Sequence, residues 1–299
     1  MKKTFLIRSL KQGSTGAVRT WPACEVLLDY LVRHGGLRDT EEKLNGSTAD
    51  VSVLDLTLPC PPLRSVSSVD FMLHSPRTAD GPTRNIVELG GGNGTLCVGL
   101  AMALNGSDDA KQKKTTFQPA ARIMCTDHDH RTVKNMRFNV TQQPRECRLG
   151  KAVRAQSLDW GDAIGGDEFS SRVEDQFGEA DDGINSNIAA SADDPMLLIT
   201  HVVGSDIHFG HTTLDPLSSV IAAFKLRNPQ INVTIMIKER NPEQFADVSD
   251  LATEIELKVV KGLEDEDDDS TIGEELQDFS VSVRDVLHDE IENMKLLEC

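Results

Sequence analysis

The stretch that decides the fold is NIVELGGGNGT, residues 85–95. Its first half is an apolar run of the kind that forms a buried strand. Three alternate glycines follow, Gly90, Gly92 and Gly94, and the apolar run LCVGLAMAL, residues 96–104, predicts a helix directly after them. A strand that turns through glycines into a helix lets a ligand approach the backbone and presents the positive helix N-terminus to an anion.

Strands and helices alternate along the rest of the chain. The strands predicted after residues 85–89 are ARIMCTD (121–127), VRAQSL (153–158), MLLITHVVGSD (196–206), INVTIMIK (231–238), IELKVV (255–260) and FSVSV (279–283). Helices are predicted from Pro22 to His34, over the stretch that holds Val133, Met136 and Val140, and from Asp215-Pro216 onward. This alternation predicts right-handed βαβ units and a doubly wound, Rossmann-like α/β fold with a mostly parallel sheet.

The chain is strongly acidic, with 31 Lys+Arg against 48 Asp+Glu and a formal net charge of −17. The excess is confined to residues 161–193 and 264–278, so the remainder is formally neutral. We expect no tight nucleic-acid binding, because that requires a basic surface. No run reaches the roughly 18 apolar residues of a membrane-spanning helix, so we also expect no membrane partner.

Cysteine usage and the N-terminus indicate the compartment. The six cysteines include no C-x-x-C pair, which favours reduced thiols in the cytoplasm or the nucleus. The first 20 residues are basic but lack the apolar core of a secretory leader, and a short mitochondrial presequence is the weaker alternative.

One domain is expected over residues 1–299, with its core at about 16–35, 85–160 and 196–285. The remaining segments are predicted to be insertions at 39–84, 105–118 and 161–193, and an acidic loop at 262–278. We interpret the acidic segments as solvated loops. The functional alternative is a negative rim that attracts basic proteins.

Polar side chains directly follow several of the predicted strands. Glu88, Asp127, Trp160 and Asp206 lie at or just after the first four. Ligands of such sheets bind at the carboxyl ends of the strands, and an acid there can accept hydrogen bonds from a ribose diol. Two groups, residues 127–130 and the set Asp206, His208 and His211, contain metal-ligand types. Adjacent residues such as 127–130 rarely converge on one ion, and the spacing of the second group is common by chance, so we predict no metal site.

Taken together, these motifs resemble the seven-β-strand, S-adenosylmethionine-dependent protein lysine methyltransferases of the methyltransferase-like group. The matching stretches are GAVRTWPACEVLLDYL (16–31), IVELGGGNGTLCVGLA (86–101), CTDHDHRTVKNMRFNV (125–140), SLDWGD (157–162) and VVGSDIHF (202–209) with PLSSVIAAFK (216–225). The resemblance implies a class I methyltransferase sheet of seven strands with the last strand antiparallel. It also implies S-adenosylmethionine as cofactor and transfer of its methyl group to a protein, most often to a lysine amine.

The resemblance assigns roles to individual residues. Trp21 would pack beside the cofactor pocket, Glu88, Gly90, Gly92 and Gly94 would form the cofactor loop, Asp127 would hold the ribose hydroxyls, and Trp160 would lie against the adenine. Asp206 begins the family's Asp-x-x-Tyr motif, which lies beside the acceptor amine. Phe209 replaces the tyrosine of that motif, and it keeps an aromatic wall but lacks the hydroxyl.

Phe209 leaves alternatives open for the function. The acceptor could be a histidine, an arginine or a small molecule, and a degenerate methyltransferase fold could serve as an interaction module. A nicotinamide dehydrogenase is disfavoured, because Thr95 stands where the dinucleotide fingerprint requires a small residue. We expect a monomer that acts on a protein substrate. A lysine amine must first lose a proton, and we expect Asp206 chiefly to position it.

Overall fold

The computed structural model describes residues 2–7, 22–33, 68–72, 84–105, 121–143, 149–161, 167–178, 195–238, 248–265, 279–286 and 294–299. Trp21 therefore lies outside the described residues, as do almost all of the predicted insertions 39–84 and 105–118. Within the described part of the chain, no helix is long and apolar enough to cross a membrane.

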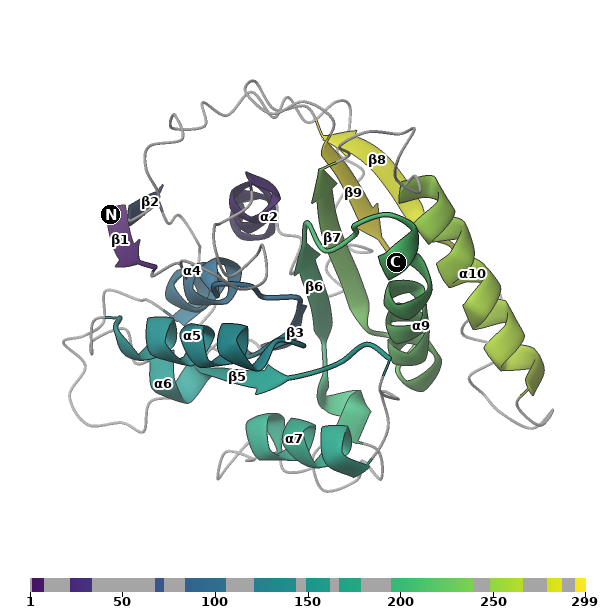
Figure 1. Cartoon of the computed structure of the whole chain (residues 1–299), viewed down its shortest axis with the longest axis horizontal. Helices are drawn as coiled ribbons and strands as arrows, with labels where there is room; N and C mark the ends of the chain where they lie inside the picture. The colour runs from purple at the N-terminus through teal and green to yellow at the C-terminus, as the bar shows by residue number, and fades with distance from the viewer. Residues whose placement is uncertain are drawn as a thin grey trace, which may run out of the picture.

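A seven-stranded sheet forms the centre of the protein (Figure 1). Across the sheet the strands are β5 (Val153–Ser157), β4 (Ala121–Asp127), β3 (Arg84–Leu89), β6 (His201–Ser205), β7 (Asn232–Lys238), β9 (Met294–Glu298) and β8 (Ser282–Val286). The first five in this order are parallel, whereas β9 is antiparallel to both of its neighbours. This confirms the predicted doubly wound α/β fold with an antiparallel last strand.

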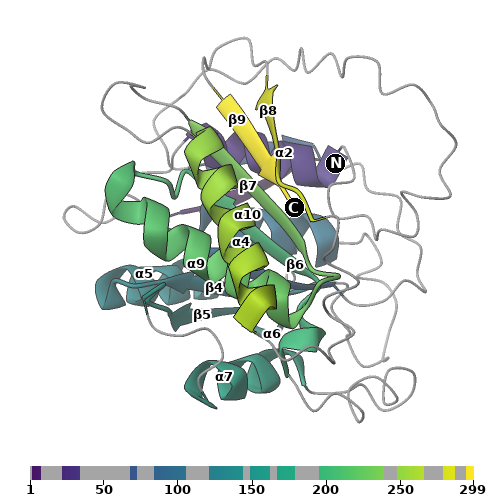
Figure 2. The same ribbon diagram turned by 90° about the vertical axis from the view of Figure 1, so that its right-hand side faces the viewer.

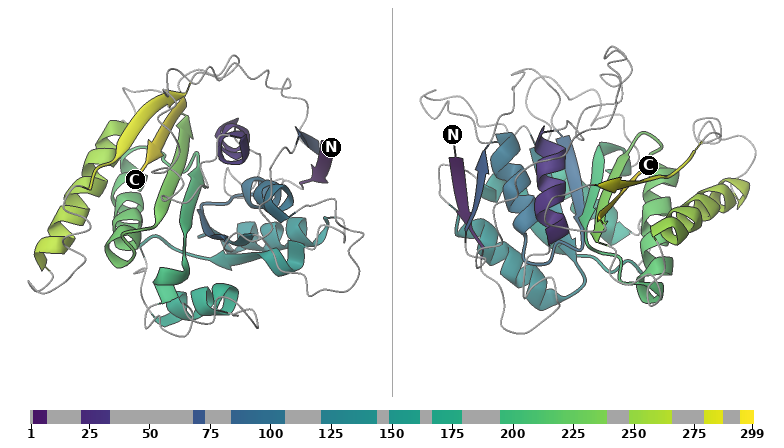
Figure 3. Two further views of the ribbon diagram at one scale, coloured as in Figure 1. Left: turned by 180° about the vertical axis from the view of Figure 1, so that it is seen from behind. Right: turned by 90° about the horizontal axis from the view of Figure 1, so that it is seen from above.

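Helices cover both faces of this sheet, as a parallel sheet requires (Figures 2 and 3). One face carries α2 (Pro22–Arg33), α4 (Thr95–Asn105), α5 (His130–Thr141) and the short α6 (Leu149–Ala152). The other face carries α7 (Asp167–Phe177), the 3-10 turn η2 (Pro195–Leu198), α9 (His211–Arg227) and α10 (Val248–Asp265). A separate antiparallel pair is formed by β1 (Lys2–Leu6) and β2 (Ser68–Met72).

Two hydrophobic clusters fill the spaces between the sheet and its helices. Successive residues of a strand point to opposite faces. Ile86 and Cys125 accordingly belong to the cluster under α2, α4 and α5, whereas Val87 and Met124 belong to the cluster under α9 and α10. The two-faced burial explains why β3 and β4 are almost continuously apolar in sequence.

The predicted strand 196–206 is wrong in its first part. Residues 195–198 form η2, and β6 begins only at His201. Nδ2 of Asn228 donates a hydrogen bond of 2.8 Å to the carbonyl of Ile199, and Nδ2 of Asn85 donates one of 2.8 Å to the carbonyl of Leu198. These side-chain amides satisfy carbonyl groups that a strand ladder would otherwise pair, so the chain turns here.

The predicted helix start at Asp215-Pro216 is also wrong. The helix α9 begins at His211, and Pro216 lies inside it. The hydroxyl of Thr213 accepts a hydrogen bond of 2.7 Å from the backbone N–H of Phe209 and thereby stabilises an earlier first turn.

Residues 255–260 are not a strand but part of α10. Ile255, Leu257 and Val259 alternate with polar residues, which is typical of a strand. Burial instead follows a spacing of four: Leu251, Ile255 and Val259 are buried, whereas Leu257 is 59% exposed. The helix thus buries one stripe and leaves the other apolar residues in solvent.

The predicted domain boundaries need three corrections. The sheet uses β9 at residues 294–298, beyond the predicted core end at 285. The predicted acidic loop 262–278 begins inside α10, which ends at Asp265. The acidic insertion 161–193 contains α7, whose Phe169, Val173 and Phe177 are buried in the core, so this part is not a solvated loop.

Candidate active site

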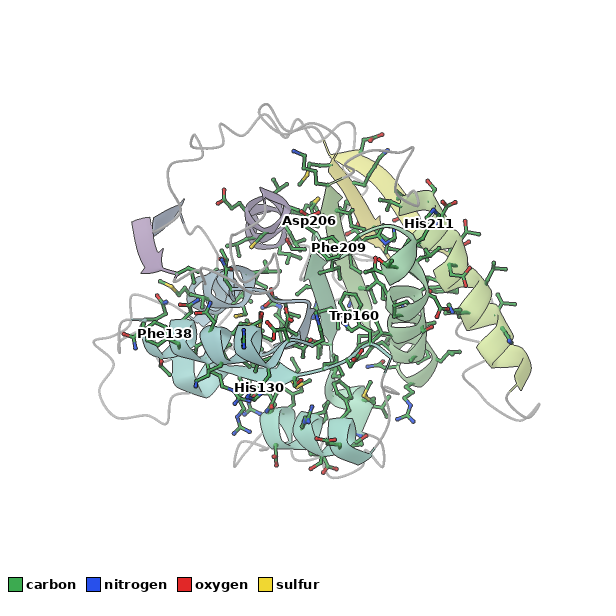
Figure 4. All side chains as sticks on the ribbon, in the orientation of Figure 1. His130, Phe138, Trp160, Asp206, Phe209 and His211 are labelled. Atoms are coloured by element: carbon green, nitrogen blue, oxygen red, sulfur yellow. The ribbon has the colours of Figure 1, made fainter. Side chains whose placement is uncertain are left out.

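The site residues gather at the carboxyl edge of the parallel strands. β3 and β6 are neighbours, and the strand order along the chain reverses between them. Such a switch point is where open α/β sheets bind their ligands. Figure 4 shows Trp160, Asp206 and Phe209 near this centre, whereas the labelled His130 and Phe138 lie on the outside of α5.

The glycine loop after β3 requires its glycines. Gly90, Gly92 and Gly94 have φ of 61°, 56° and 82°, a region that other residues enter only at a cost. A Cβ added at Gly90 would lie 2.6 Å from Cγ2 of Ile207 and 3.5 Å from Cζ2 of Trp160. The space beside Gly90 is therefore narrow, because the side chains of Ile207 and Trp160 both lie close to it.

Asp127 at the end of β4 is joined to the glycine loop. Its Oδ2 accepts a hydrogen bond of 3.1 Å from the N–H of Gly92, and its Oδ1 accepts one of 3.0 Å from the N–H of Asp129. Burial raises the pKa of this carboxyl above its ordinary value, although the two amides act in the opposite direction. The carboxylate is thus held in one orientation beside the loop. A fixed orientation suits a group that is predicted to accept hydrogen bonds from a ribose diol.

Asn139 is a loop-supporting residue that sequence reasoning missed. It is buried on α5, and its Nδ2 donates a hydrogen bond of 2.7 Å to the carbonyl of Asn93 in the glycine loop. The side chain of Asn93 in turn accepts hydrogen bonds from the N–H and the hydroxyl of Thr95, the first residue of α4. One feature of the sequence could have identified Asn139: two polar residues, Asn135 and Asn139, share the helix face of the apolar Val133 and Met136.

Glu88 points under the loop rather than into solvent. It is buried, and its Oε2 accepts a hydrogen bond of 2.9 Å from the thiol of Cys125. Burial raises the pKa of Glu88 to about 7, although the thiol hydrogen bond acts against this rise. Ligand-type atoms of Glu88, Cys97 and Cys125 lie within 4.8 Å of one another, the one such group among the residues that the structure describes.

The two thiols have different hydrogen-bond acceptors: that of Cys125 donates to Glu88, and that of Cys97 donates to the carbonyl of Gly94 at 3.2 Å. Burial raises the pKa of Cys125 well above its ordinary value, so this thiol keeps its proton near neutral pH. The protonated thiol donates its hydrogen to the Glu88 carboxylate. The sequence also offered residues 127–130, and Asp206 with His208 and His211, as metal ligands. Among the described residues, neither group brings three ligand-type atoms within 4.8 Å of one another.

Asp206 and Phe209 occupy the turn after β6. Asp206 is buried and has a φ of 55°, the one positive φ outside glycine in the described ranges. Its N–H donates a hydrogen bond of 2.7 Å to the carbonyl of Met236, and its Oδ1 accepts one of 3.3 Å from the N–H of Lys238. Two bonds to β7 therefore fix a backbone conformation that costs energy, which is typical of functional sites. Phe209 is partly exposed.

The geometry fits the predicted cofactor. A glycine loop at a helix N-terminus, a fixed carboxylate on the neighbouring strand and an indole beside Gly90 are groups that can hold the amino acid, ribose and adenine parts of S-adenosylmethionine, respectively. Two assignments stay predictions. The first gives the cofactor Glu88, Gly90, Gly92, Gly94, Asp127 and Trp160, and the second gives the acceptor Asp206 and Phe209. Trp21 is outside the described residues.

Comparison with known proteins identifies the family. A model of the lysine methyltransferase family matches residues 3–181, more than half of the chain. This match includes the glycine loop and Asp127 but ends before Asp206 and Phe209. No curated protein matches the chain in sequence.

Several solved structures are similar at low identity. The human methyltransferase 10 domain containing protein has a TM-score of 0.40 and 8% identity, over 74% of this chain and 72% of that one. A METTL16 methyltransferase domain has a TM-score of 0.39 and 12% identity, over 73% of both chains. An O-methyltransferase family protein from Burkholderia thailandensis has a TM-score of 0.35 and 14% identity, over 72% of this chain and 50% of that one.

The family match and the observed sheet lead to one conclusion. The order of the strands, with its antiparallel β9, is that of a class I methyltransferase, and the methyl donor is S-adenosylmethionine. The chain belongs to the lysine methyltransferase family.

Proposed function

We propose that this methyltransferase acts on a lysine side chain of a protein. The family match supports this proposal, but it ends before the acceptor side of the site. The observation that carries it is the turn after β6, where the buried Asp206 is held at a φ of 55° next to the strand that leads into the glycine loop.

The turn offers two functions to a lysine side chain. The carboxylate of Asp206 can bind and orient an ammonium group, and the ring of Phe209 can contact the aliphatic stem and the cation. Asp206 is buried whereas Phe209 is partly exposed. We therefore expect a side chain that enters from the surface to contact the ring first and the carboxylate second.

The chemistry requires a neutral, well-placed nitrogen. When bound, S-adenosylmethionine supplies a methyl group that its sulfonium already activates. An amine removed from water loses its proton more easily, because burial disfavours the charged form. Once the amine is neutral, Asp206 and Phe209 would act by placement, which alone can lower a reaction barrier by about 7–11 kcal/mol.

A labelling experiment tests this proposal. The purified full chain is incubated with cell lysate and tritiated S-adenosylmethionine, and labelled proteins are mapped by mass spectrometry. We expect the added methyl group on lysine. The Asp206→Asn variant should label at least about tenfold more slowly. Asp285→Asn should label normally, because Asp285 is an exposed carboxylate that pairs with Lys295 at 2.9 Å.

Other results would assign another function. Methyl groups on histidine or arginine would identify one of the alternative acceptors and overturn the lysine assignment. No labelled protein despite tight cofactor binding would favour a small-molecule acceptor or an interaction module.

A further inference from the structure

One part of this acidic protein is strongly basic. Residues 130–158 contain seven Lys or Arg and a single acidic residue, in a chain with a net charge of −17. Three of these cations, Arg131, Lys134 and Arg137, follow one another at a spacing of three along α5. The cofactor site described above uses none of them.

The three cations lie on the outward face of α5, and we call them the α5 basic face. Each is exposed, whereas the opposite side of the helix, including Val133 and Met136, is buried against the sheet. At about 1.5 Å per residue, the face extends over about 9 Å of helix. Figure 4 shows His130 and Phe138 on this outer side, with nitrogen atoms gathered beside His130.

The described residues do not neutralise these charges. None of the three forms an ion pair with a residue of the described ranges, and Arg137 instead donates its Nε–H to the carbonyl of Ala155 at 2.9 Å. Elsewhere the pattern differs, because Lys258 and Lys295 pair with aspartates at 2.6 and 2.9 Å.

The face begins at the catalytic edge of the sheet. α5 starts three residues after Asp127, and Asp129 caps it by accepting hydrogen bonds from the N–H groups of Arg131 and Thr132. Arg131 is thus in the helix turn nearest the cofactor loop. A chain bound along α5 would lie with one end beside the carboxyl edge of the sheet.

We propose that the α5 basic face docks an acidic segment of the protein that this enzyme methylates, an inference that rests on the proposed function. The three positive charges extend over only a short length of helix, which matches a short run of acidic residues in a peptide. A nucleic acid carries its charge over a long distance, whereas this face extends over only about 9 Å. Phe138, 37% exposed at the end of the same face, adds an apolar contact that peptide side chains can use.

Exposed ion pairs are individually weak, so the docking should be salt-sensitive. The test measures fluorescence anisotropy of a labelled peptide of about eight glutamates with the full chain, at about 20 mM and about 300 mM salt. Two double variants with the same change in net charge are compared. Arg131→Glu/Lys134→Glu alters the face, and Arg227→Glu/Lys261→Glu alters two cations on α9 and α10, outside residues 130–158.

We expect the face variant to bind at least about tenfold more weakly at low salt, whereas the control stays within about twofold of the wild type. Equal weakening in both variants, or no binding by the wild type, would overturn the proposal. Tighter binding of a single-stranded RNA of equal charge, lost in the face variant, would also overturn it and assign the face to nucleic acid.

The peptide readout needs no methyl transfer, so it is separate from the proposed function. With a labelled protein substrate in hand, the face variant should raise KM and leave kcat unchanged. A wild type that binds the peptide but methylates no protein would overturn the proposed function alone.

Discussion

The N–H of Gly92 donates a hydrogen bond of 3.1 Å to Oδ2 of Asp127, and this bond joins the loop after β3 to the end of β4. Thirty-five residues separate the two in sequence. Their contact means that the glycine loop and the Asp127 carboxylate form one unit. A change in either residue should therefore disturb the position of the other.

Gly90 should tolerate no side chain. In the Gly90→Ala variant the φ of 61° would cost about 1–2 kcal/mol of unfolding free energy, and the new Cβ would lie 2.6 Å from Cγ2 of Ile207. Cofactor affinity should fall at least about tenfold in calorimetric titration. Gly150→Ala is the control, because no atom lies within 4 Å of its added Cβ. Equal behaviour of the two variants would show that the narrow space at Gly90 does not matter.

Glu88 should make the unliganded protein less stable as the pH rises. Its pKa is about 7 in the folded protein, above its ordinary value of 4.5, so the folded state binds the proton more tightly. The stabilisation by this proton is complete below pH 4.5 and is lost between pH 4.5 and about 7, at a total of about 3 kcal/mol.

The Glu88→Gln variant isolates this effect in urea unfolding. It should match the wild type near pH 4.5 and exceed its unfolding free energy at pH 8, because the amide needs no proton to remain neutral. The same variant should bind S-adenosylmethionine more weakly. An identical pH dependence in the two proteins would refute the raised pKa.

Asp206 should affect the turnover rate and not the affinity for the cofactor. Asn tolerates the φ of 55° at this position, so Asp206→Asn keeps the turn and removes the charge. We expect kcat on the labelled protein to fall at least about tenfold, with an unchanged Kd for S-adenosylmethionine. Undiminished turnover would exclude Asp206 from the acceptor site.

The helix α7 should be essential for stability despite its acidic sequence. Phe169 is buried, and its ring meets that of Phe224 edge-on at 6.0 Å. Phe169→Ala should lower the unfolding free energy by about 3–5 kcal/mol, whereas Phe138→Ala on the surface of α5 should change it by less than about 0.5 kcal/mol. Similar denaturant midpoints for the two variants would mean that α7 is not packed on the core.

The central part of the fold could be predicted because its signals are local. β3, the glycines and α4 follow one another within residues 84–105, and each is marked by its own residue types. α7 could not be predicted, because its three buried apolar residues lie among the acids of residues 161–193, whose net charge suggests a solvated loop. β9 has only five residues and acquires its role by pairing with β7 and β8.

The candidate site shows the same division. Glu88, Asp127 and Asp206 could be placed at one edge, because parallel strands bring their carboxyl ends together. The support of the loop by Asn139 depends on a contact with Asn93, 46 residues away, which no spacing indicates. The inward direction of Glu88 likewise depends on Cys125, which the strand pairing places beside it.

The measurement that tests the account most directly is calorimetric titration of the full chain with S-adenosylmethionine. We predict binding at about micromolar Kd, lost in Asp127→Ala and retained in Asp129→Ala. Asp129 is a suitable control, because it caps α5 two residues away and does not hold the glycine loop. Absence of binding by the wild type, or equal affinity of the Asp127→Ala variant, would contradict the assignment of this site.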